Sequence, residues 1–232
     1  MTFILAEGPI AVPSLAGIVI YGCRFDSEQY DDTWFERLAI DRPLFLDDAV
    51  RSRRAEYLAG RHCASRGLAA IGIVPRSIRM GALRQPLFPA PSAGSISHIP
   101  GRACAAVVAG GPSMVGIDVQ DVIDAPTARE IAPNIVTPEE EAMLFAVFGE
   151  RAITVAFSIK ETFFKAACPQ VGRYFGFEEV AVTHVRDAGS TVELTAVRGT
   201  GDALRAGARA EVRLTWLDEQ TVLSVLAGEA HV

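Results

Sequence analysis

The chain has 232 residues; half of them are hydrophobic, 22% are charged, and the net charge is −6. This composition can bury a sizeable core, which excludes a disordered, collagen-like or coiled-coil protein, and the acidic balance does not favour a nucleic-acid binder. No apolar run approaches the roughly 18 residues of a membrane span. The apolar N-terminus has no Lys or Arg before Arg24, unlike a signal peptide. We therefore expect a cytoplasmic protein.

The cysteines and lysines are distributed unevenly. The four cysteines lie far apart and form no C-x-x-C motif, so neither a disulfide framework nor a zinc site is expected, and buried reduced thiols are predicted. Only two of the 22 basic residues are lysines, and both fall in the segment FSIKETFFKA, as Lys160 and Lys165. An ammonium is a point charge on a flexible stem, so these two positions are candidates for binding an anion.

In chain order, the first clear element is a helix over residues 47–70, with Asp47 as N-cap and Pro75 beyond its end. Helical spacing puts Arg54 and Arg61 at the border of its apolar face. Four residues share that face: Val50, Tyr57, Ala64 and Leu68. The two arginines either pass their stems along the core or hold a ligand.

The middle of the chain is less regular. Residues 75–101 are rich in Pro, Gly and Ser and predict a loop with one short strand. Two apolar runs, 102–109 and 114–119, are broken at Gly110-Gly111-Pro112 and predict a hairpin. The same break divides the chain into two predicted halves, residues 1–111 and 112–232.

The second half predicts helices followed by strands. Thr137-Pro138-Glu139-Glu140 is a helix start with a capping box, and a second helix covers about 151–167. Four strand-like stretches follow, at 178–186, 191–197, 209–217 and 221–228. Helices mixed with antiparallel strands predict the α+β class.

Two segments of this half place carboxylates on defined faces. In the strand-like run VGIDVQ, alternation puts Asp118 and Gln120 on one face, where both could offer oxygens to a hard cation. The alternative is that Asp118 ends a strand and caps a turn. In the helix at 151–167, Glu161 and Lys165 share a narrow arc as an i,i+4 pair, while Lys160 points toward the apolar side. The alternative is an ordinary amphipathic helix with one ion pair.

The segment GSISHIPG at 94–101 carries Ser97 and His98 between glycines. Hydroxyls and an imidazole beside free backbone N–H groups suit the binding of an anion. The alternative is a structural histidine in a loop.

The order of these segments is more specific than any one of them. An arginine-rich helix with RRAEYLAGR is followed by RQPLFP, GSISH, GIDVQ, FSIKETFFKA and GRYFGFEE. This order resembles the 4′-phosphopantetheinyl transferases, and more closely the enterobactin-synthase-associated, siderophore branch of the surfactin-type group. The resemblance covers about residues 53–177.

The resemblance implies two similar α/β halves related by an approximate twofold axis, in a monomer that binds the nucleotide between them. It implies an enzyme that moves the phosphopantetheine arm of coenzyme A onto a serine of an acyl or peptidyl carrier protein. Adenosine 3′,5′-bisphosphate is released and Mg²⁺ is required. Two alternatives remain: a degenerate member that binds coenzyme A or a carrier without turnover, and a metal-dependent hydrolase of a nucleotide pyrophosphate.

For the second half, the resemblance implies roles for the acids and lysines. Asp118 and Glu161 would bind the metal, with Glu161 or a metal-bound water as the base for the attacking serine. Lys165, and Lys160 from the same K-E-x-x-x-K motif, would contact the cofactor. Gln120 stands where the family has a carboxylate, so we expect a weaker metal site with a raised Mg²⁺ requirement, in which Mn²⁺ is an alternative metal.

For the first half, the resemblance implies a set of groups around the nucleotide. His98 would contact the 3′-phosphate together with Arg53 or Arg54, a choice that the sequence leaves open, and Ser97 would add a hydroxyl near the phosphates. Three further residues are weaker candidates: Arg61, Arg84 and Gln85.

Overall fold

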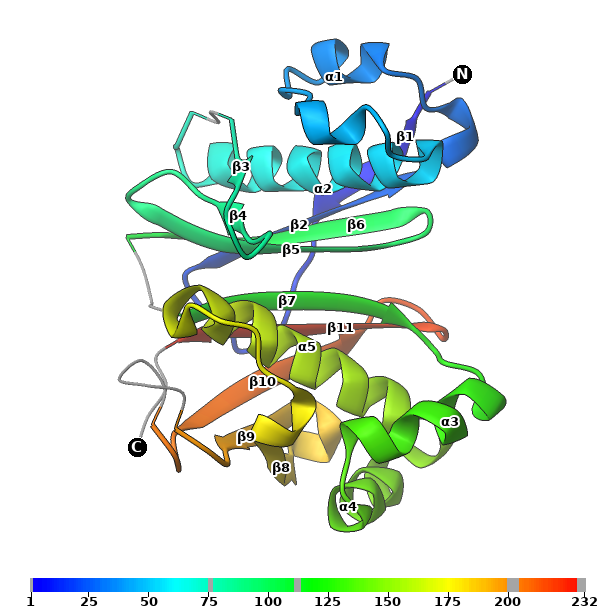
Figure 1. The fold of residues 1–232 in the computed structure, drawn as a ribbon, viewed down its shortest axis with the longest axis vertical. Helices are drawn as coiled ribbons and strands as arrows, with labels where there is room; N and C mark the ends of the chain where they lie inside the picture. The colour runs from blue at the N-terminus through cyan, green and yellow to red at the C-terminus, as the bar shows by residue number, and fades with distance from the viewer. Residues whose placement is uncertain (1, 75–76, 111–113, 200–204, 229–232) are drawn as a thin grey trace. The chain divides into compact units, whose positions relative to one another are not determined.

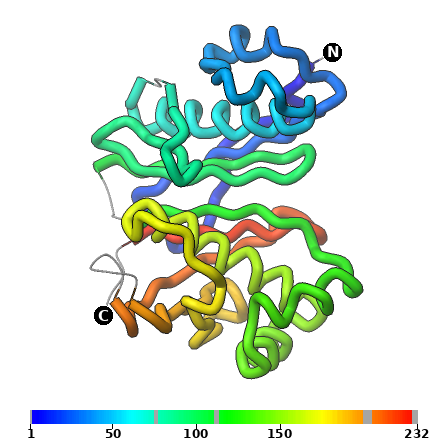
Figure 2. The backbone as a smooth tube through the Cα atoms, viewed as in Figure 1, coloured from blue at the N-terminus to red at the C-terminus, as the bar shows by residue number. Residues whose placement is uncertain are grey.

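The computed structural model describes residues 2–74, 77–110, 114–199 and 205–228. The chain divides into two compact units, Met1–Gly111 and Pro112–Val232, and each has its own sheet and its own apolar core (Figure 1). The backbone trace in Figure 2 follows the antiparallel course of both sheets. The mixture of helices and antiparallel strands confirms the predicted α+β class.

The first unit is a four-stranded antiparallel sheet covered on one face by a long helix, α2 (Arg51–Ala70). The strand order is β1-β2-β6-β5, with bounds Ile4–Pro9 for β1, Ile18–Phe25 for β2, Arg102–Ala109 for β6 and Ser92–Ile99 for β5. The core between α2 and the sheet includes Phe25, Leu58, Cys63 and Ala105. Short elements complete the unit: Ser27–Gln29 (η1), Thr33–Arg37 (α1), Leu44–Leu46 (η2), Arg79–Met80 (β3) and Pro86–Leu87 (β4).

The start of α2 differs from the prediction. The helix begins at Arg51, and Asp47 does not cap it, because the Asp47 carboxylate lies 2.6 Å from Arg42 and the residue follows a short 3-10 turn. The N-cap position belongs to Val50, which has no capping side chain and is 70% exposed. The predicted core position of Val50 is therefore wrong.

The middle of the chain also differs. Residues 92–99 form strand β5, which makes a hairpin with β6 through a turn in which Gly101 has a φ of 76°. The predicted hairpin of 102–109 with 114–119 is wrong, because β6 pairs with β2 and β5 whereas β7 (Met114–Asp121) pairs with β11. Most of the predicted break, at Gly111 and Pro112, lies outside the described residues, as does Pro75.

The second unit is a five-stranded antiparallel sheet in the order β7-β11-β10-β9-β8. Its other strands confirm the four predicted stretches: Val180–Arg186 (β8), Thr191–Ala196 (β9), Arg209–Trp216 (β10) and Thr221–Gly228 (β11). Two short 3-10 turns, Phe177–Glu179 (η4) and Asp187–Gly189 (η5), flank β8. Three helices complete the unit: Ala125–Ile135 (α3), Pro138–Phe148 (α4) and Ala152–Val171 (α5), with a 3-10 turn at Gly149–Arg151 (η3) before α5. Helix α5 packs against the sheet, and α3 and α4 pack against α5.

Local capping explains where two of these helices begin. The capping box of α4 is confirmed, since Thr137 accepts from the backbone N–H of Glu140 while the Glu140 side chain accepts from that of Thr137. The sequence did not predict α3, although Asp124 caps it by accepting from Thr127 N.

Helix α5 forms the centre of the second core, where Val155, Ile159 and Phe163 are fully buried. Among the described residues, one stretch, Pro138–Val171, is long and apolar enough to cross a membrane by length and composition alone. A core helix passes the same test, and the packing of α5 against its own sheet accounts for its apolar character.

The approach of α5 to β7 depends on Gly116. A Cβ added to Gly116 would lie 2.0 Å from the carbonyl oxygen of Thr162 on α5, which is a clash with backbone. By contrast, a Cβ added to Gly228, which pairs with Met114 on the neighbouring strand, meets nothing within 4 Å.

We therefore predict that Gly116→Ala lowers the free energy of unfolding of the second unit by ~2–3 kcal/mol, because α5 must move off β7. Gly228→Ala is the matched control and should change the free energy of unfolding little. Thermal and urea unfolding of the two variants measure the difference; equal stabilities would contradict this account of the packing.

Candidate active site

The site in the second unit is built on the close contact between β7 and α5. Asp118 lies on the same strand face as Gly116, which faces α5, and its side chain is buried, with the residue 4% exposed. The ammonium of Lys165 lies 2.6 Å from Asp118 Oδ1. This ion pair joins the middle of the edge strand to the fourth turn of the helix, and it brings together two residues that the sequence predicted as site residues.

Glu161 lies one helical turn before Lys165. Burial raises the pKa of Glu161, the nearby Asp118 carboxylate raises it further, and the Lys165 ammonium opposes both effects. The three predicted residues therefore form one electrostatic cluster of two carboxylates and one ammonium. In the part of the chain that the structure describes, no group of three or more His, Cys, Asp or Glu side chains is placed to hold a metal ion.

A network of hydroxyl groups holds α5 against the strand beside Asp118. Ser224 on β11 stands opposite Asp118 in the ladder, and its hydroxyl lies 2.7 Å from Ser158 Oγ and 2.6 Å from Thr162 Oγ1. The sequence analysis did not single out Thr162 or Ser224. The signal for Ser224 was a hydroxyl between the apolar residues of the strand TVLSVLAG, whose other hydroxyl, on Thr221, stands at the strand's first residue.

Gln120 follows Asp118 on the same face of β7 and is partly buried. Its amide nitrogen donates to the carbonyl oxygen of Asp121 at 3.0 Å. Gln120 can therefore offer a cation only its side-chain amide oxygen, which carries no formal charge.

Lys160 lies away from this cluster. Its ammonium is 1% exposed and donates to Ile135 O at 2.7 Å and Phe177 O at 3.3 Å, with Glu140 Oε1 at 2.9 Å. Burial lowers the pKa of Lys160, and the Glu140 carboxylate opposes that shift. These contacts use the three donors of Lys160 inside the second unit and do not support the expected contact with a cofactor.

The first unit brings His98 and Arg53 together. His98 on β5 faces α2, where its Nε2 lies 2.9 Å from Arg53 Nη1 and its Nδ1 lies 3.5 Å from Glu56. Arg54 points elsewhere: it binds Asp32 at 3.1 Å and donates to the carbonyl oxygens of Asp47 and Ala49. The structure thus favours Arg53 over Arg54 as the partner of His98.

Ser97 lies in a different environment from His98. Neighbouring residues of a strand point to opposite faces, so Ser97 faces away from α2 and is buried. The expected loop with free backbone N–H groups is wrong, because Ser97 and His98 lie in the β5–β6 ladder opposite Cys104 and Ala103.

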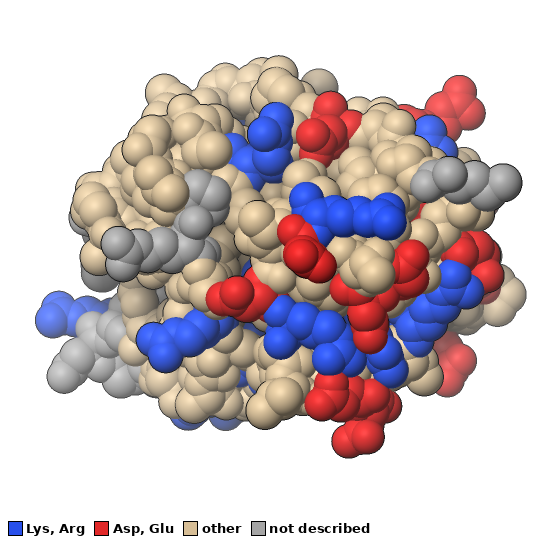
Figure 3. All heavy atoms as spheres, turned by 90° about the horizontal axis from the view of Figure 1, so that it is seen from above, with Lys and Arg blue, Asp and Glu red and all other residues tan. Residues whose placement is uncertain are grey.

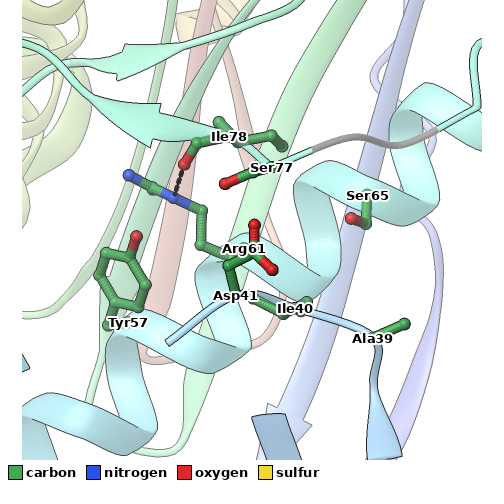
Figure 4. Close-up of a pocket in the computed structure, with 8 residues that line it drawn as sticks. All are labelled: Ala39, Ile40, Asp41, Tyr57, Arg61, Ser65, Ser77 and Ile78. Atoms are coloured by element: carbon green, nitrogen blue, oxygen red, sulfur yellow. Dashed lines mark hydrogen bonds between the residues drawn. The ribbon is translucent and has the colours of Figure 1, made fainter. Parts of the chain in front are cut away.

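Arg61 lines a cavity of about 200 Å³ in the first unit (Figure 4). Its guanidinium lies over the ring of Tyr57 at 4.6 Å, and its Nε donates to Ile78 O at 2.8 Å. Ser65 and Ser77 also line the cavity. Burial lowers the pKa of Arg61, and the charge of Arg53 acts in the same direction.

The two remaining candidates, Arg84 and Gln85, lie in the turn between β3 and β4. Arg84 is exposed and has a φ of 62° at the turn between β3 and β4. The side chain of Gln85 accepts from Leu83 N at 2.9 Å, which fixes that turn. Neither residue is grouped with His98 or Arg53 by any contact found among the described residues.

The surface carries both charge signs. In the face shown in Figure 3, basic and acidic side chains are interspersed. At the start of α2, Arg51 pairs with Glu28 and Arg54 with Asp32, so these arginines are partly neutralised.

Two family models match the chain. The 4′-phosphopantetheinyl transferase N-terminal domain matches residues 41–109, and the 4′-phosphopantetheinyl transferase superfamily matches residues 114–218, which include Asp118, Glu161 and Lys165.

Curated relatives match 60–66% of this chain. Enterobactin synthase component D of Escherichia coli strain K12 is 38% identical over 159 residues, which is 66% of this chain and 72% of that protein. The 4′-phosphopantetheinyl transferase Npt of Nocardia iowensis is 30% identical over 61% of this chain and 64% of its own length. The 4′-phosphopantetheinyl transferase PptT of Mycobacterium tuberculosis is 31% identical over 60% and 62%.

The raised pKa of Glu161 predicts a stability effect that depends on pH. The folded chain favours protonated Glu161, so this stabilisation is present below the unfolded pKa and is lost as the pH rises through the folded pKa. Glu161→Gln mimics the protonated form. With a chelator present, it should raise the melting temperature at pH 8, and this difference should vanish below about pH 4.

The exposed Glu150 provides the control, because Glu150→Gln should leave the melting temperature almost unchanged at both pH values. A Glu161→Gln variant that melts at or below the wild-type temperature at pH 8 would contradict the account that burial and the Asp118 carboxylate disfavour the charged form of Glu161.

Proposed function

The chain belongs to the 4′-phosphopantetheinyl transferase superfamily, whose members use coenzyme A and transfer its phosphopantetheine arm to carrier proteins, and from this premise we propose its reaction. The enzyme moves the arm onto a serine hydroxyl of an apo carrier protein, releases adenosine 3′,5′-bisphosphate and requires Mg²⁺. The observation that carries this proposal is the cluster of Asp118, Glu161 and Lys165.

The donor set of this cluster fits Mg²⁺. Asp118 and Glu161 supply carboxylate oxygens and Gln120 an amide oxygen, which are the hard ligands that Mg²⁺ prefers while it keeps several waters. Burial is the main reason why the pKa of Glu161 is raised, and the Asp118 carboxylate adds to it, so a dication beside the two carboxylates would favour their charged forms. When bound, the metal would neutralise negative charge on the diphosphate of coenzyme A.

The protein residues then have distinct tasks. Lys165 holds Asp118 in the free chain and, by a change of partner, would donate to a diphosphate oxygen. A raised pKa makes the Glu161 carboxylate a better proton acceptor, so we assign to it the serine hydroxyl proton. The serine oxygen attacks the phosphorus that bears the pantetheine arm, and the bridging P–O bond breaks to give the bisphosphate.

Residues of the first unit would bind the 3′-phosphate. Arg53 and His98 lie 2.9 Å apart and offer a planar guanidinium and an imidazole to a phosphate monoester. Arg61 and its cavity provide a further cationic position on the same helix face, because residues 53, 57 and 61 are spaced four apart. Arg54, Arg84 and Gln85 have structural partners or positions that do not support this role.

The enterobactin synthase relatives support a carrier protein of siderophore assembly as the acceptor. The chain is proposed to act as a monomer in the cytoplasm. The four free, buried cysteines are compatible with a reducing compartment.

The test is to incubate the chain with coenzyme A, Mg²⁺ and a purified apo carrier and to weigh the carrier. A gain of one phosphopantetheine group supports the transferase. Binding without a mass gain would instead indicate a degenerate binding protein, and cleavage of coenzyme A in the absence of a carrier would indicate a hydrolase.

Arg53→Ala tests the 3′-phosphate site. The variant should raise the KM for coenzyme A roughly tenfold, because a charge-assisted contact is lost, and should leave the KM for 3′-dephospho-coenzyme A unchanged. Arg54→Ala is the matched control on the same helix and should leave the KM values for both nucleotides unchanged. An equal loss with both nucleotides would refute the assignment.

Gln120→Glu tests the metal site. The added carboxylate should lower the Mg²⁺ concentration for half-maximal transfer, because a charged oxygen replaces a neutral one beside Asp118. The exposed Gln170 at the end of α5 provides the control variant Gln170→Glu, which should leave the metal curve in place. The idea is wrong if Gln120→Glu also leaves that curve unchanged.

A further inference from the structure

A buried ion pair between Lys160 and Glu140 lies next to the candidate active site along α5. The ammonium of Lys160 makes three contacts, with Ile135 O, Phe177 O and Glu140 Oε1, which matches its three donors. The side chain is 1% exposed and Glu140 is also buried. The pair is thus fully desolvated and fully hydrogen-bonded.

The Glu140 carboxylate has further partners. Its Oε2 accepts from Thr137 N at 2.8 Å, within the capping box of α4, and its Oε1 accepts from Val182 N on β8 at 2.6 Å. Both oxygens are therefore fixed by backbone donors as well as by Lys160.

Together these contacts join five elements at one point. Ile135 is the last residue of α3, Glu140 lies in the first turn of α4, Lys160 is in the middle of α5, Phe177 begins η4, and Val182 belongs to β8. Lys160 is the position where α5 is tied to the parts of the second unit that lie away from β7.

Stability alone does not account for such a pair. A buried ion pair is often no more stabilising than apolar side chains of similar volume, whereas one partner without the other is strongly destabilising. Its directional contacts attach one face of α5 to fixed backbone groups of α3 and η4 and to Glu140 of α4. Glu161 is the next residue along this helix, and Lys165 follows one turn later, so the rotation of α5 determines whether both face Asp118.

We propose that Lys160 is a positioning residue: anchored by Glu140, Ile135 O and Phe177 O, it fixes the rotation of α5 that places Glu161 and Lys165 opposite Asp118 on β7. This inference rests on the proposed function, because it concerns the metal and diphosphate site. Lys160 itself contacts neither group.

Two variants test it. Lys160→Met leaves Glu140 buried with its charge unpaired. The double variant Lys160→Met/Glu140→Gln removes both charges, so it should regain much of the stability that the single variant loses. In both, the Mg²⁺ concentration for half-maximal transfer should rise roughly tenfold to a hundredfold, as for residues that orient metal ligands. Calorimetric titration with coenzyme A in Mg²⁺ should show a matching loss of affinity, independent of turnover.

The control is Glu193→Gln on strand β9, which lies three positions from β7 in the strand order; it breaks another buried charge network of the second unit, with His184 and Arg186. It should lower the melting temperature without moving the metal curve or the affinity for coenzyme A.

The outcomes separate the possibilities. A double variant that is folded but has a shifted metal curve and weaker coenzyme A binding supports the proposal. The proposal is overturned if either variant keeps the wild-type metal curve and the wild-type affinity for coenzyme A. It is also overturned if Glu193→Gln shifts the metal curve by the same amount, because the effect would then come from general destabilisation. If Lys160→Met does not fold, the double variant decides. Failure of the wild-type chain to modify any carrier would refute the proposed function itself.

Discussion

The ion pair between Lys165 and Asp118 is the interaction on which the candidate site depends. It requires α5 to lie directly against β7, and the absent side chain of Gly116 permits that approach, because Thr162 O occupies the place of a Cβ. The hydroxyl groups of Ser158 and Thr162 then bind Ser224 on the next strand. A small residue and a short hydroxyl network therefore determine where two charged side chains of α5 meet the strand.

The charges of the site are arranged for a ligand more than for stability. Two carboxylates lie near one ammonium, and burial, with a smaller contribution from repulsion by Asp118, raises the pKa of Glu161 despite the opposing charge of Lys165. A bound dication would relieve that repulsion, and Lys165 would then be available to an anionic ligand. The opposite side of α5 has the reverse arrangement, in which the charges of Lys160 and Glu140 are fully satisfied by fixed partners. The side of α5 that carries Lys160 is therefore anchored, whereas the side that carries Glu161 and Lys165 has charges that a bound ligand would neutralise.

The parts of this structure that follow from local rules could be predicted. The capping box at Thr137, the α5 helix and the alternation that puts Asp118 on the face toward α5 all arise from residues close in sequence. Where partners lie far apart in the chain, the pattern was insufficient. Asp47 looked like a helix cap, but its carboxylate binds Arg42 instead.

The same limit applies to the strands and to Lys160. Strand β5 contains Ser, Ala and Gly, which have low strand propensity, and it forms because β6 pairs with it along its whole length. The apolar runs of β6 and β7 were equally suited to a hairpin, and only pairing with distant strands excludes it. The motif that Lys160 shares with Glu161 and Lys165 predicts a contact with the cofactor, whereas its buried partner Glu140 belongs to another helix that the motif does not include.

The most direct measurement is a crystal structure with Mn²⁺ and coenzyme A, with the metal located by its anomalous scattering. We expect the metal at ~2.0–2.2 Å from carboxylate oxygens of both Asp118 and Glu161, with Lys165 moved from Asp118 to the diphosphate. A metal bound elsewhere, or an intact pair of Lys165 with Asp118 beside a bound diphosphate, would contradict the account.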